Sequence, residues 1–230
     1  MPSDLEKPTT TSSNKANYLL LLILFIVSLP YILDRIVPYK YLEINNMGGS
    51  TSKVPALEAM KTVIPGHPKS LMGYWYVISC VPTFLEKGAR NSLELYEMID
   101  EEEQKLKVTF SYKSKQTQKE PSIFYQDGRV IAKDTGAEWK VRPRVWGMPL
   151  PVWMPFIILD VDPNSYMVVG QPDRSYLWIM FRTPNFDSSK LEELETKCVK
   201  EFGYKKEDMY RVPQEWGEDY PGKESEGKAE

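Results

Sequence analysis

The segment Lys105-Leu-Lys-Val-Thr-Phe-Ser-Tyr112 alternates strictly between polar and apolar side chains. Its apolar residues, which share one face, are Leu106, Val108, Phe110 and Tyr112. A period of two sustained over a whole segment is typical of a β-strand with one buried and one solvated face. This segment therefore predicts a sheet whose inner face is hydrophobic.

Similar short segments continue on both sides of this strand, spaced at about 8–15 residues and separated by turn residues. The predicted strands are 73–80, 91–98, 105–112, 121–133, 138–145, 155–161, 165–170 and 176–182. No helical period competes with them before Asp187. Such a series of strands predicts an all-β domain in which a barrel closes the sheet on itself and removes its edges.

A helix is predicted from Ser188 to Phe202. Asp187 and the two serines after it offer N-cap oxygens, and Gly203 provides a stop signal. Its apolar stripe at helical spacing consists of Leu191, Leu194, Cys198 and Phe202. The fold class is therefore an eight-stranded antiparallel up-and-down β-barrel with one C-terminal α-helix packed outside.

A second unit is predicted at the N-terminus. Eighteen uncharged residues lie between Lys15 and Asp34, which as a helix give about 27 Å, enough to cross a hydrocarbon core. The sequence predicts a transmembrane helix at 16–37 and hence a single-pass protein of a secretory-pathway or organelle membrane. Two alternatives are a cleaved secretory signal, which would make the protein secreted, and a buried globular helix.

Composition divides the rest of the chain. Residues 1–15 are polar and predicted to be disordered, and residues 38–70 are rich in Gly, Ser and Pro, which is typical of a linker. The barrel domain is predicted at 71–217. The remaining 218–230 is predicted to be an acidic disordered tail.

Charge and residue counts exclude several classes of protein. The net charge is −3, and no basic stripe suggests nucleic acid as a partner. The single histidine, His67, lies in the predicted linker and rules out a His-rich metal site. Cys80 and Cys198 are too few for a disulfide scaffold; they either pair where the helix covers the first strand, or Cys198 is a small core residue. No cofactor, metal or catalytic group is predicted.

Four blocks of sequence resemble the lipocalin family. They are Gly73-Tyr74-Trp75, Phe84-Leu-Glu-Lys-Gly88, Pro155-Phe-Ile-Ile-Leu-Asp-Val-Asp162 with Ser165-Tyr166, and Val169–Pro184. The first matches the G-x-W signature of the family. The others resemble segments of apolipoprotein D and of the bacterial outer-membrane lipoprotein lipocalin. The resemblance runs from about Leu71 to Trp216 in the family's order.

The resemblance implies a structural signature and a ligand class. Gly73 and Trp75 would open the barrel, with Trp75 closing one end and Arg182 lying across it, a cation–π pair worth about 0.5–2 kcal/mol. The family's barrels bind small hydrophobic ligands such as fatty acids and lysophospholipids. These are the expected partners of this chain, together with the membrane; the oligomeric state is left open.

If Trp178 and Arg182 both lie on the inner face of the last strand, the alternation of side chains along each strand predicts which residues line the ligand site. They are Tyr96, Leu106, Val108, Phe110, Trp139, Val141, Phe156, Ile158, Tyr176, Trp178 and Met180. Leu177, Ile179 and Phe181 would face outward under the helix. Apolar and aromatic walls suit a lipid pocket. The alternative is that these large side chains fill the barrel and leave no cavity.

The same alternation places Glu94 and Asp160 inside the barrel. An unpaired buried carboxylate is costly, so each needs a partner or a raised pKa, unless a bulge turns it outward. If both faced inward, they would be the one feature on which an enzyme acting on a lipid could rest.

An apolar connection joins the fifth and sixth predicted strands. Trp146, Leu150, Trp153 and Met154 are interpreted as a membrane-touching or lid loop. The alternative is a loop folded over its own barrel end.

The function predicted from the sequence is a membrane-anchored lipocalin that binds or transports a small hydrophobic ligand. The alternative is a non-binding barrel that serves as an accessory or assembly subunit of a membrane complex.

Overall fold

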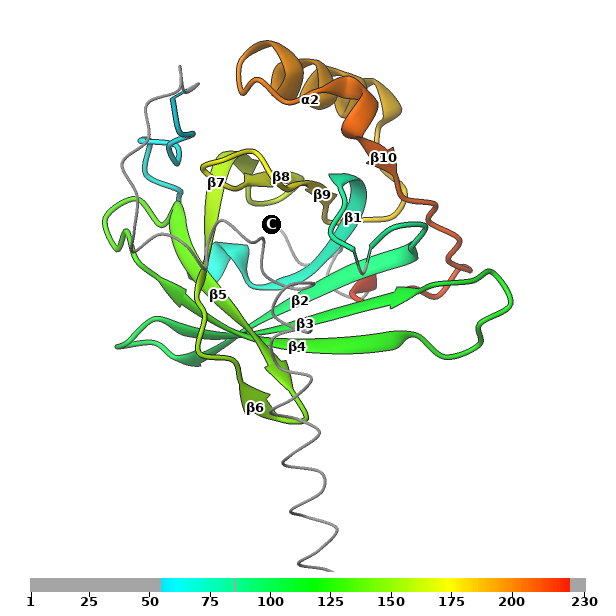
Figure 1. Cartoon of the computed structure of the whole chain (residues 1–230), viewed down its shortest axis with the longest axis horizontal. Helices are drawn as coiled ribbons and strands as arrows, with labels where there is room; N and C mark the ends of the chain where they lie inside the picture. The colour runs from blue at the N-terminus through cyan, green and yellow to red at the C-terminus, as the bar shows by residue number, and fades with distance from the viewer. Residues whose placement is uncertain (1–54, 85, 224–230) are drawn as a thin grey trace, which may run out of the picture. The chain divides into compact units, whose positions relative to one another are not determined.

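The computed structural model describes residues 55–84 and 86–223, and these form the predicted barrel (Figure 1). Its eight main strands are β1 (Gly73–Val81), β2 (Arg90–Asp100), β3 (Lys105–Lys113), β4 (Ser122–Val130), β5 (Glu138–Val145), β7 (Met154–Asp162), β8 (Tyr166–Gly170) and β9 (Leu177–Phe181). Neighbours in this order pair antiparallel, and β1 also pairs with β9, which closes the sheet. The predicted strands are confirmed, with ends that shift by at most three residues. The predicted transmembrane helix lies outside the described residues.

Two short strands complete the sheet. β6 (Met148–Pro149) pairs with β5, and β10 (Tyr210–Arg211) pairs with β1. The first half of β1 pairs with β2, as in Tyr74 opposite Leu95, whereas its second half pairs with β10.

The chain after β10 continues along this opening. The Val212 amide donates to Ile78 O at 2.8 Å, and the Asn91 amide of β2 donates to Pro213 O at 2.8 Å. A C-terminal segment therefore fills the gap where β1 and β2 separate, which strand patterns alone did not predict.

Side-chain alternation divides the barrel into two hydrophobic layers. The inner cluster includes Trp75, Tyr96, Trp139, Ile158 and Met180. The outer cluster lies between the barrel wall and the helix, and includes Leu177, Ile179 and Phe181 as predicted. A strand that is buried on both faces, such as β9, therefore needs the helix as its cover.

That cover is α2 (Ser188–Lys200), which lies across the β8–β9 side of the barrel in Figure 1. Asp187 caps it by accepting from the Ser189 amide at 2.8 Å. The buried Leu191, Leu194 and Cys198 of α2 belong to the outer cluster. The helix thus begins where its capping residue predicts and docks by the predicted stripe.

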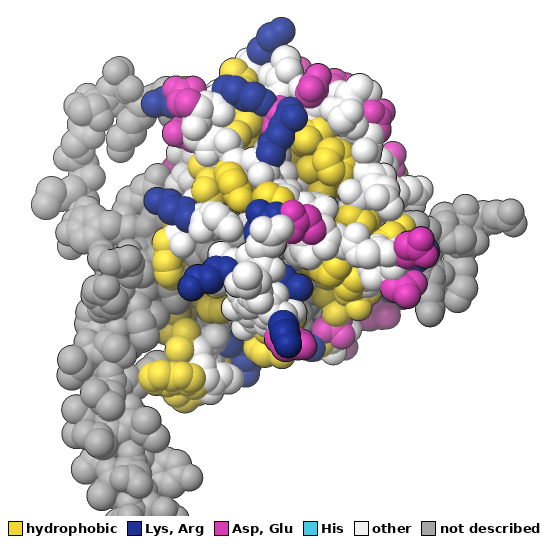
Figure 2. All heavy atoms as spheres, turned by 90° about the vertical axis from the view of Figure 1, so that its right-hand side faces the viewer, with side chains coloured by type: hydrophobic (Ala, Val, Ile, Leu, Met, Phe, Trp, Pro, Cys, Tyr) yellow, Lys and Arg dark blue, Asp and Glu magenta, His cyan; other side chains and the backbone are white. Residues whose placement is uncertain are grey.

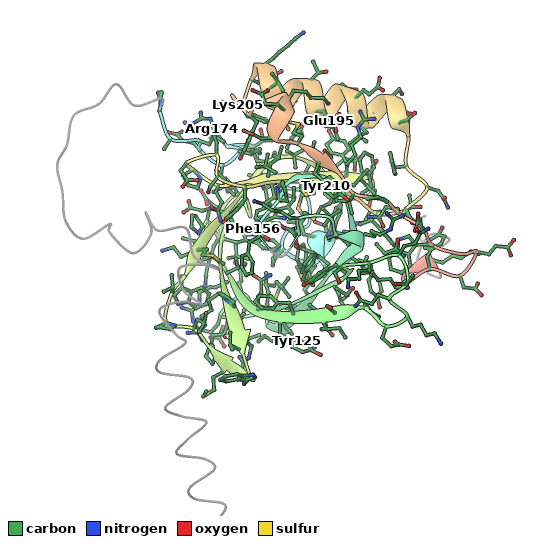
Figure 3. The ribbon with its side chains drawn as sticks, turned by 45° about the vertical axis from the view of Figure 1, so that its right-hand side comes forward. Tyr125, Phe156, Arg174, Glu195, Lys205 and Tyr210 are labelled. Carbon is green, nitrogen blue, oxygen red and sulfur yellow. The ribbon has the colours of Figure 1, made fainter. Side chains whose placement is uncertain are left out.

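A buried carboxylate attaches α2 to the barrel. Glu195 accepts from Ser79 Oγ of β1 at 2.8 Å and from Arg211 Nη2 of β10 at 2.7 Å, and it also pairs with Lys206. Figure 3 shows Glu195 between α2 and the barrel wall. Burial raises the pKa of Glu195, but the donors outweigh this effect and bring the pKa down to about 2.

The predicted linker ends earlier than residue 70. The Met60 amide donates to Ile158 O at 2.8 Å, the Ile64 amide donates to Thr135 O at 2.9 Å, and the Ile64 side chain is fully buried in the inner cluster. His67 is half-buried instead of exposed. The prolines and glycines of this stretch interrupt the periodicity that would predict a helix or strand, but single apolar side chains still pack on the barrel.

The predicted tail also starts later than residue 218. The Tyr220 ring contacts the ring of Tyr76 edge-on at 6.1 Å, and the Tyr76 hydroxyl donates to Pro221 O. The outer wall near β1 is therefore covered by the first residues of the acidic segment.

Both cysteines are free and buried. Cys80 belongs to the inner cluster and Cys198 to the outer one, so the barrel wall separates them. The pairing considered for them is not formed, and the interpretation of Cys198 as a core residue is confirmed.

Charges are mixed on the surface that Figure 2 draws, where Lys, Arg, Asp, Glu and hydrophobic side chains are interspersed. None of the helices in the described part of the chain is long and apolar enough to cross a membrane.

The docking of α2 predicts a large loss of stability when its apolar stripe is shortened. We expect Leu194→Ala to lower the free energy of unfolding by about 2–5 kcal/mol, because the side chain is fully buried against the barrel. Urea unfolding followed by tryptophan fluorescence measures the loss. Thr196→Ala, on the exposed side of α2, is the control. A loss below about 1 kcal/mol for Leu194→Ala would contradict the docking.

Candidate ligand site inside the barrel

One end of the barrel is closed by a stack of Arg182 on Trp75. The guanidinium carbon of Arg182 lies 3.6 Å from the centroid of the Trp75 ring. Arg182 also donates to Ser70 O at 2.6 Å, Met72 O at 2.9 Å and Pro163 O at 2.9 Å. Burial lowers the pKa of Arg182 to about 10. The guanidinium is thus engaged by carbonyl groups and a ring at this end of the barrel, away from the other end.

Above this floor an aromatic column runs along the interior. The Tyr96 ring meets the Trp139 ring edge-on at 5.6 Å, and Trp139 stacks on Phe156 at 5.2 Å. Phe156 in turn stacks on Trp178 at 6.4 Å. Figure 3 shows Phe156 directed into the barrel, whereas Tyr125 lies outside β4. These residues come from β2, β5, β7 and β9, so the column joins opposite walls.

Burial along the inner wall is graded from one end to the other. The fully buried members are Leu106, Val108, Trp139, Ile158, Met180 and Tyr96, at 0–2% exposure. Toward the end of β3 and the start of β9, Phe110 is 5% exposed, Val141 and Phe156 are 7% exposed, and Trp178 is only half-buried. Tyr176, just before β9, is also half-buried and belongs to neither cluster, but its ring contacts that of Trp178. An inward side chain that keeps accessible surface faces space that water can reach. We call this half the open half of the barrel.

Glu94 faces the interior, as alternation predicts. It is 7% exposed, and its Oε2 accepts from the hydroxyl of Tyr96 two residues along the same strand. Burial raises its pKa from the usual 4.5 to about 7, a rise that the Tyr96 hydrogen bond opposes and the negative charge of Glu86 reinforces.

Glu86 is a second buried carboxyl group, which the sequence did not single out. It lies between β1 and β2 and is 3% exposed. Trp178 Nε1 donates to its Oε1 at 2.7 Å, and the Thr83 amide donates to its Oε2 at 2.9 Å. Burial raises its pKa. In sequence it belongs to Phe84–Gly88, where an acid followed by lysine and glycine is typical of an exposed loop.

Asp160 does not face the interior, so that prediction is wrong. The pairing of β7 with β8 shifts between Ile158 and Asp160, and this bulge turns the carboxylate outward. There it accepts from Lys197 Nζ of α2 at 2.7 Å. Glu94 and Asp160 therefore lie on opposite sides of the wall, and the catalytic pair on which an enzyme hypothesis depended does not exist.

The loop before β7 is only partly exposed. Trp146 is 67% exposed, but Leu150 is buried and its amide donates to Pro143 O at 2.8 Å. Trp153 lies against the guanidinium of Arg142 at 4.6 Å, and Met154 packs against the inner cluster. Leu150 and Met154 thus cannot serve a membrane-touching loop.

Within residues 55–84 and 86–223, no three His, Cys, Asp or Glu side chains gather as metal ligands would. The chemistry of the interior is therefore that of aromatic rings, aliphatic walls and buried carboxyl groups.

A model of the lipocalin-like domain matches residues 69–214. The chain belongs to the lipocalin family. Temperature-induced lipocalin-1 of Arabidopsis thaliana is 36% identical over 66 residues, which are 28% of this chain and 35% of that protein. The match therefore spans about a third of the length of the plant protein. The assignment of this lipocalin to its family depends on the domain match over residues 69–214.

Solved structures agree on the fold. Insecticyanin from the tobacco hornworm Manduca sexta superposes with a TM-score of 0.52 at 16% identity, covering 75% of this chain and 89% of that one. H1 crustacyanin from the lobster Homarus americanus gives 0.51 at 11% identity, covering 73% and 94%. At such identities the likeness concerns the fold alone.

The raised pKa of Glu94 predicts a pH-dependent stability. Because the folded-state pKa is raised, the stabilisation is present below pH 4.5 and is lost as the pH rises through about 7. Glu94→Gln keeps an acceptor for Tyr96 but carries no charge. We expect its free energy of unfolding, relative to that of the wild type, to rise by about 3 kcal/mol as the pH increases from 4.5 to above 7.

Urea unfolding at pH 4.5, 6 and 8 measures this difference. Glu97→Gln is the matched control, since Glu97 is on the outer face of the same strand and pairs with Lys107. A difference between wild type and Glu94→Gln that does not change with pH would show that Glu94 titrates normally.

Proposed function

We propose that this protein is a membrane-anchored lipocalin that binds or shuttles a small hydrophobic ligand, such as a fatty acid, a lysophospholipid or a similar lipid, in the open half of its barrel. The observation that supports this most is the graded burial of the inner wall. A barrel filled only for packing would not leave Trp178, which packs against the inner cluster, half-buried.

Binding would be driven by removal of apolar surface from water. The wall of the open half is built from Phe110, Val141, Phe156, Tyr176 and Trp178, and each Å² of apolar area buried contributes about 25 cal/mol. Aromatic walls with few polar groups suit a ligand with a long chain or rings. The filled floor sets the depth to which such a ligand enters.

The proposed anchor is residues 16–37. An anchor in the bilayer would hold the barrel near a lipid source and raise the effective concentration of ligand. The described residues begin at Pro55 and already pack on the barrel near Leu57, whose amide donates to Pro172 O at 2.8 Å. About a dozen and a half residues, 38–54, would then separate anchor and barrel.

The filled closed half favours one further candidate, an accessory or assembly subunit that binds no ligand. Only the carrier function predicts that a substitution inside the open half reduces lipid binding.

Blocking the open half is expected to abolish ligand binding. Val141→Phe adds a ring to the inner wall and should reduce co-purified lipid about tenfold or more, because overpacking displaces the ligand. Ile123→Phe is the matched control, since Ile123 is 53% exposed on the outside of β4. The measurement is lipid extraction and native mass spectrometry of the full chain from a eukaryotic host. A wild-type barrel that carries no lipid and accepts none on titration would favour the assembly subunit.

The anchor is tested separately. We expect the wild-type chain to stay in the membrane pellet during alkaline carbonate extraction. Leu22→Arg with Ile26→Arg should release it, since each charge at the centre of a span costs about 2.5–3.5 kcal/mol. Thr11→Arg with Asn14→Arg adds the same charge outside the span and should change nothing. A wild-type chain found in the supernatant, with an N-terminus beyond residue 37, would show a cleaved signal.

A further inference from the structure

The open half of the barrel contains two carboxyl groups that pair with no Lys or Arg among the residues that the structure describes. Glu94 and Glu86 are both more than nine-tenths buried. Their hydrogen-bond donors are neutral: the Tyr96 hydroxyl for Glu94, and the Trp178 indole and the Thr83 amide for Glu86. In the described part of the chain, neither forms an ion pair with Lys or Arg.

A third polar group nearby is unpartnered. Ser92 is 1% exposed, and its Oγ has no hydrogen-bond partner. It precedes Glu94 by two residues on β2. The β2–β3 pairing shifts between Arg90 and Leu93, but the adjacent Leu93 packs in the outer cluster, which directs Ser92 to the inner face. A buried hydroxyl with no partner is uncommon in folded proteins. It therefore points to a group that is bound there when the site is occupied.

The cations of the neighbourhood are committed elsewhere. Arg182 is saturated by carbonyl groups and by the Trp75 ring at the floor. Lys197 pairs with Asp160 on the outside of the wall. Within residues 55–84 and 86–223, no Lys or Arg forms an ion pair with the inner carboxyl groups, and a ligand can supply the counter-charge.

We propose that the open half of the barrel binds an amphiphile with one protonated amine and an apolar chain or ring. The ammonium group would lie between Glu94 and Glu86 and offer its third N–H to the Ser92 hydroxyl, since an ammonium has three donors and no acceptor. The apolar part would lie along Phe156 and Trp178. This inference rests on the proposed function and narrows its ligand class.

Charge decides between amine and acid heads. A fatty-acid carboxylate placed beside two buried carboxyl groups meets only like charge, whereas an ammonium removes the cost of ionising them. The aromatic rings of Trp178 and Phe156 add a further attraction for a cation that lies over their faces. A carboxylate could accept only from the Ser92 hydroxyl or from a protonated Glu94, whereas an ammonium is attracted by the carboxylates, the hydroxyl oxygen and the rings.

The test compares three probes with the same chain and different heads: octylamine, octan-1-ol and octanoate. Binding to the full chain in lipid nanodiscs is measured by calorimetry and tryptophan fluorescence, with protein-free nanodiscs as the blank for partitioning. We expect octylamine to bind about tenfold or more tightly than octanol, and octanoate to bind most weakly.

Variants separate the head-group site from the cavity. Glu94→Gln and Glu86→Gln should each weaken octylamine about tenfold and leave octanol unchanged, while Glu97→Gln on the outer face should leave both unchanged. If a variant fails to fold, the pH dependence of octylamine binding to the unmodified chain tests the same site. An alkylammonium stays charged up to about pH 10, so its affinity should rise about tenfold from pH 5.5 to pH 8 as Glu94 loses its proton, and that of octanol should not.

The outcomes distinguish this inference from the proposed function. Equal binding of the three probes, or tightest binding of octanoate, would overturn the amine site and leave a hydrophobic carrier. Binding of none of them would overturn both.

Discussion

The contact of Arg182 with Trp75 is the interaction on which the arrangement of the interior depends. Its guanidinium lies over the face of the Trp75 ring, 3.6 Å from the centroid, and donates to carbonyl groups before β1, on β1 and after β7. Three segments far apart in sequence thus meet at one side chain. Because these contacts engage most of the N–H donors of the half-buried Arg182, they fix the packing at this end of the barrel.

In the other half of the barrel, the aromatic column determines how the side chains are arranged. Trp139 and Phe156 stack in parallel, and Tyr96 meets both edge-on. Such contacts fix ring orientations beyond what apolar burial alone requires. The column ends at Trp178, which is held in turn by its indole N–H to Glu86. The position of the buried acid between β1 and β2 is therefore determined by the rings below it.

Alternation predicted most of this interior from the sequence, because a closed sheet leaves each side chain only two directions. It placed Glu94 and Val141 correctly. It failed at Asp160, since a bulge shifts alternation by one residue without a sequence mark. It was also silent on Glu86 and on the segment around Val212, which have no period of their own. Their burial arises from contacts distant in sequence, as does that of Ile64 in a stretch that reads as a linker.

The buried carboxyl groups outside and inside the barrel wall differ in their partners. On the outside, Glu195 is buried but has Arg211 and Lys206 as partners, and its pKa falls to about 2, while Asp160 pairs with Lys197. On the inside, Glu94 has only neutral donors, and burial raises its pKa to about 7. Within the described residues, these two outer acids therefore have Lys or Arg partners, and Glu94 and Glu86 have none. Two carboxyl groups buried without a cation cost stability relative to apolar residues of similar size, and the amine ligand that we propose would complete their charge balance.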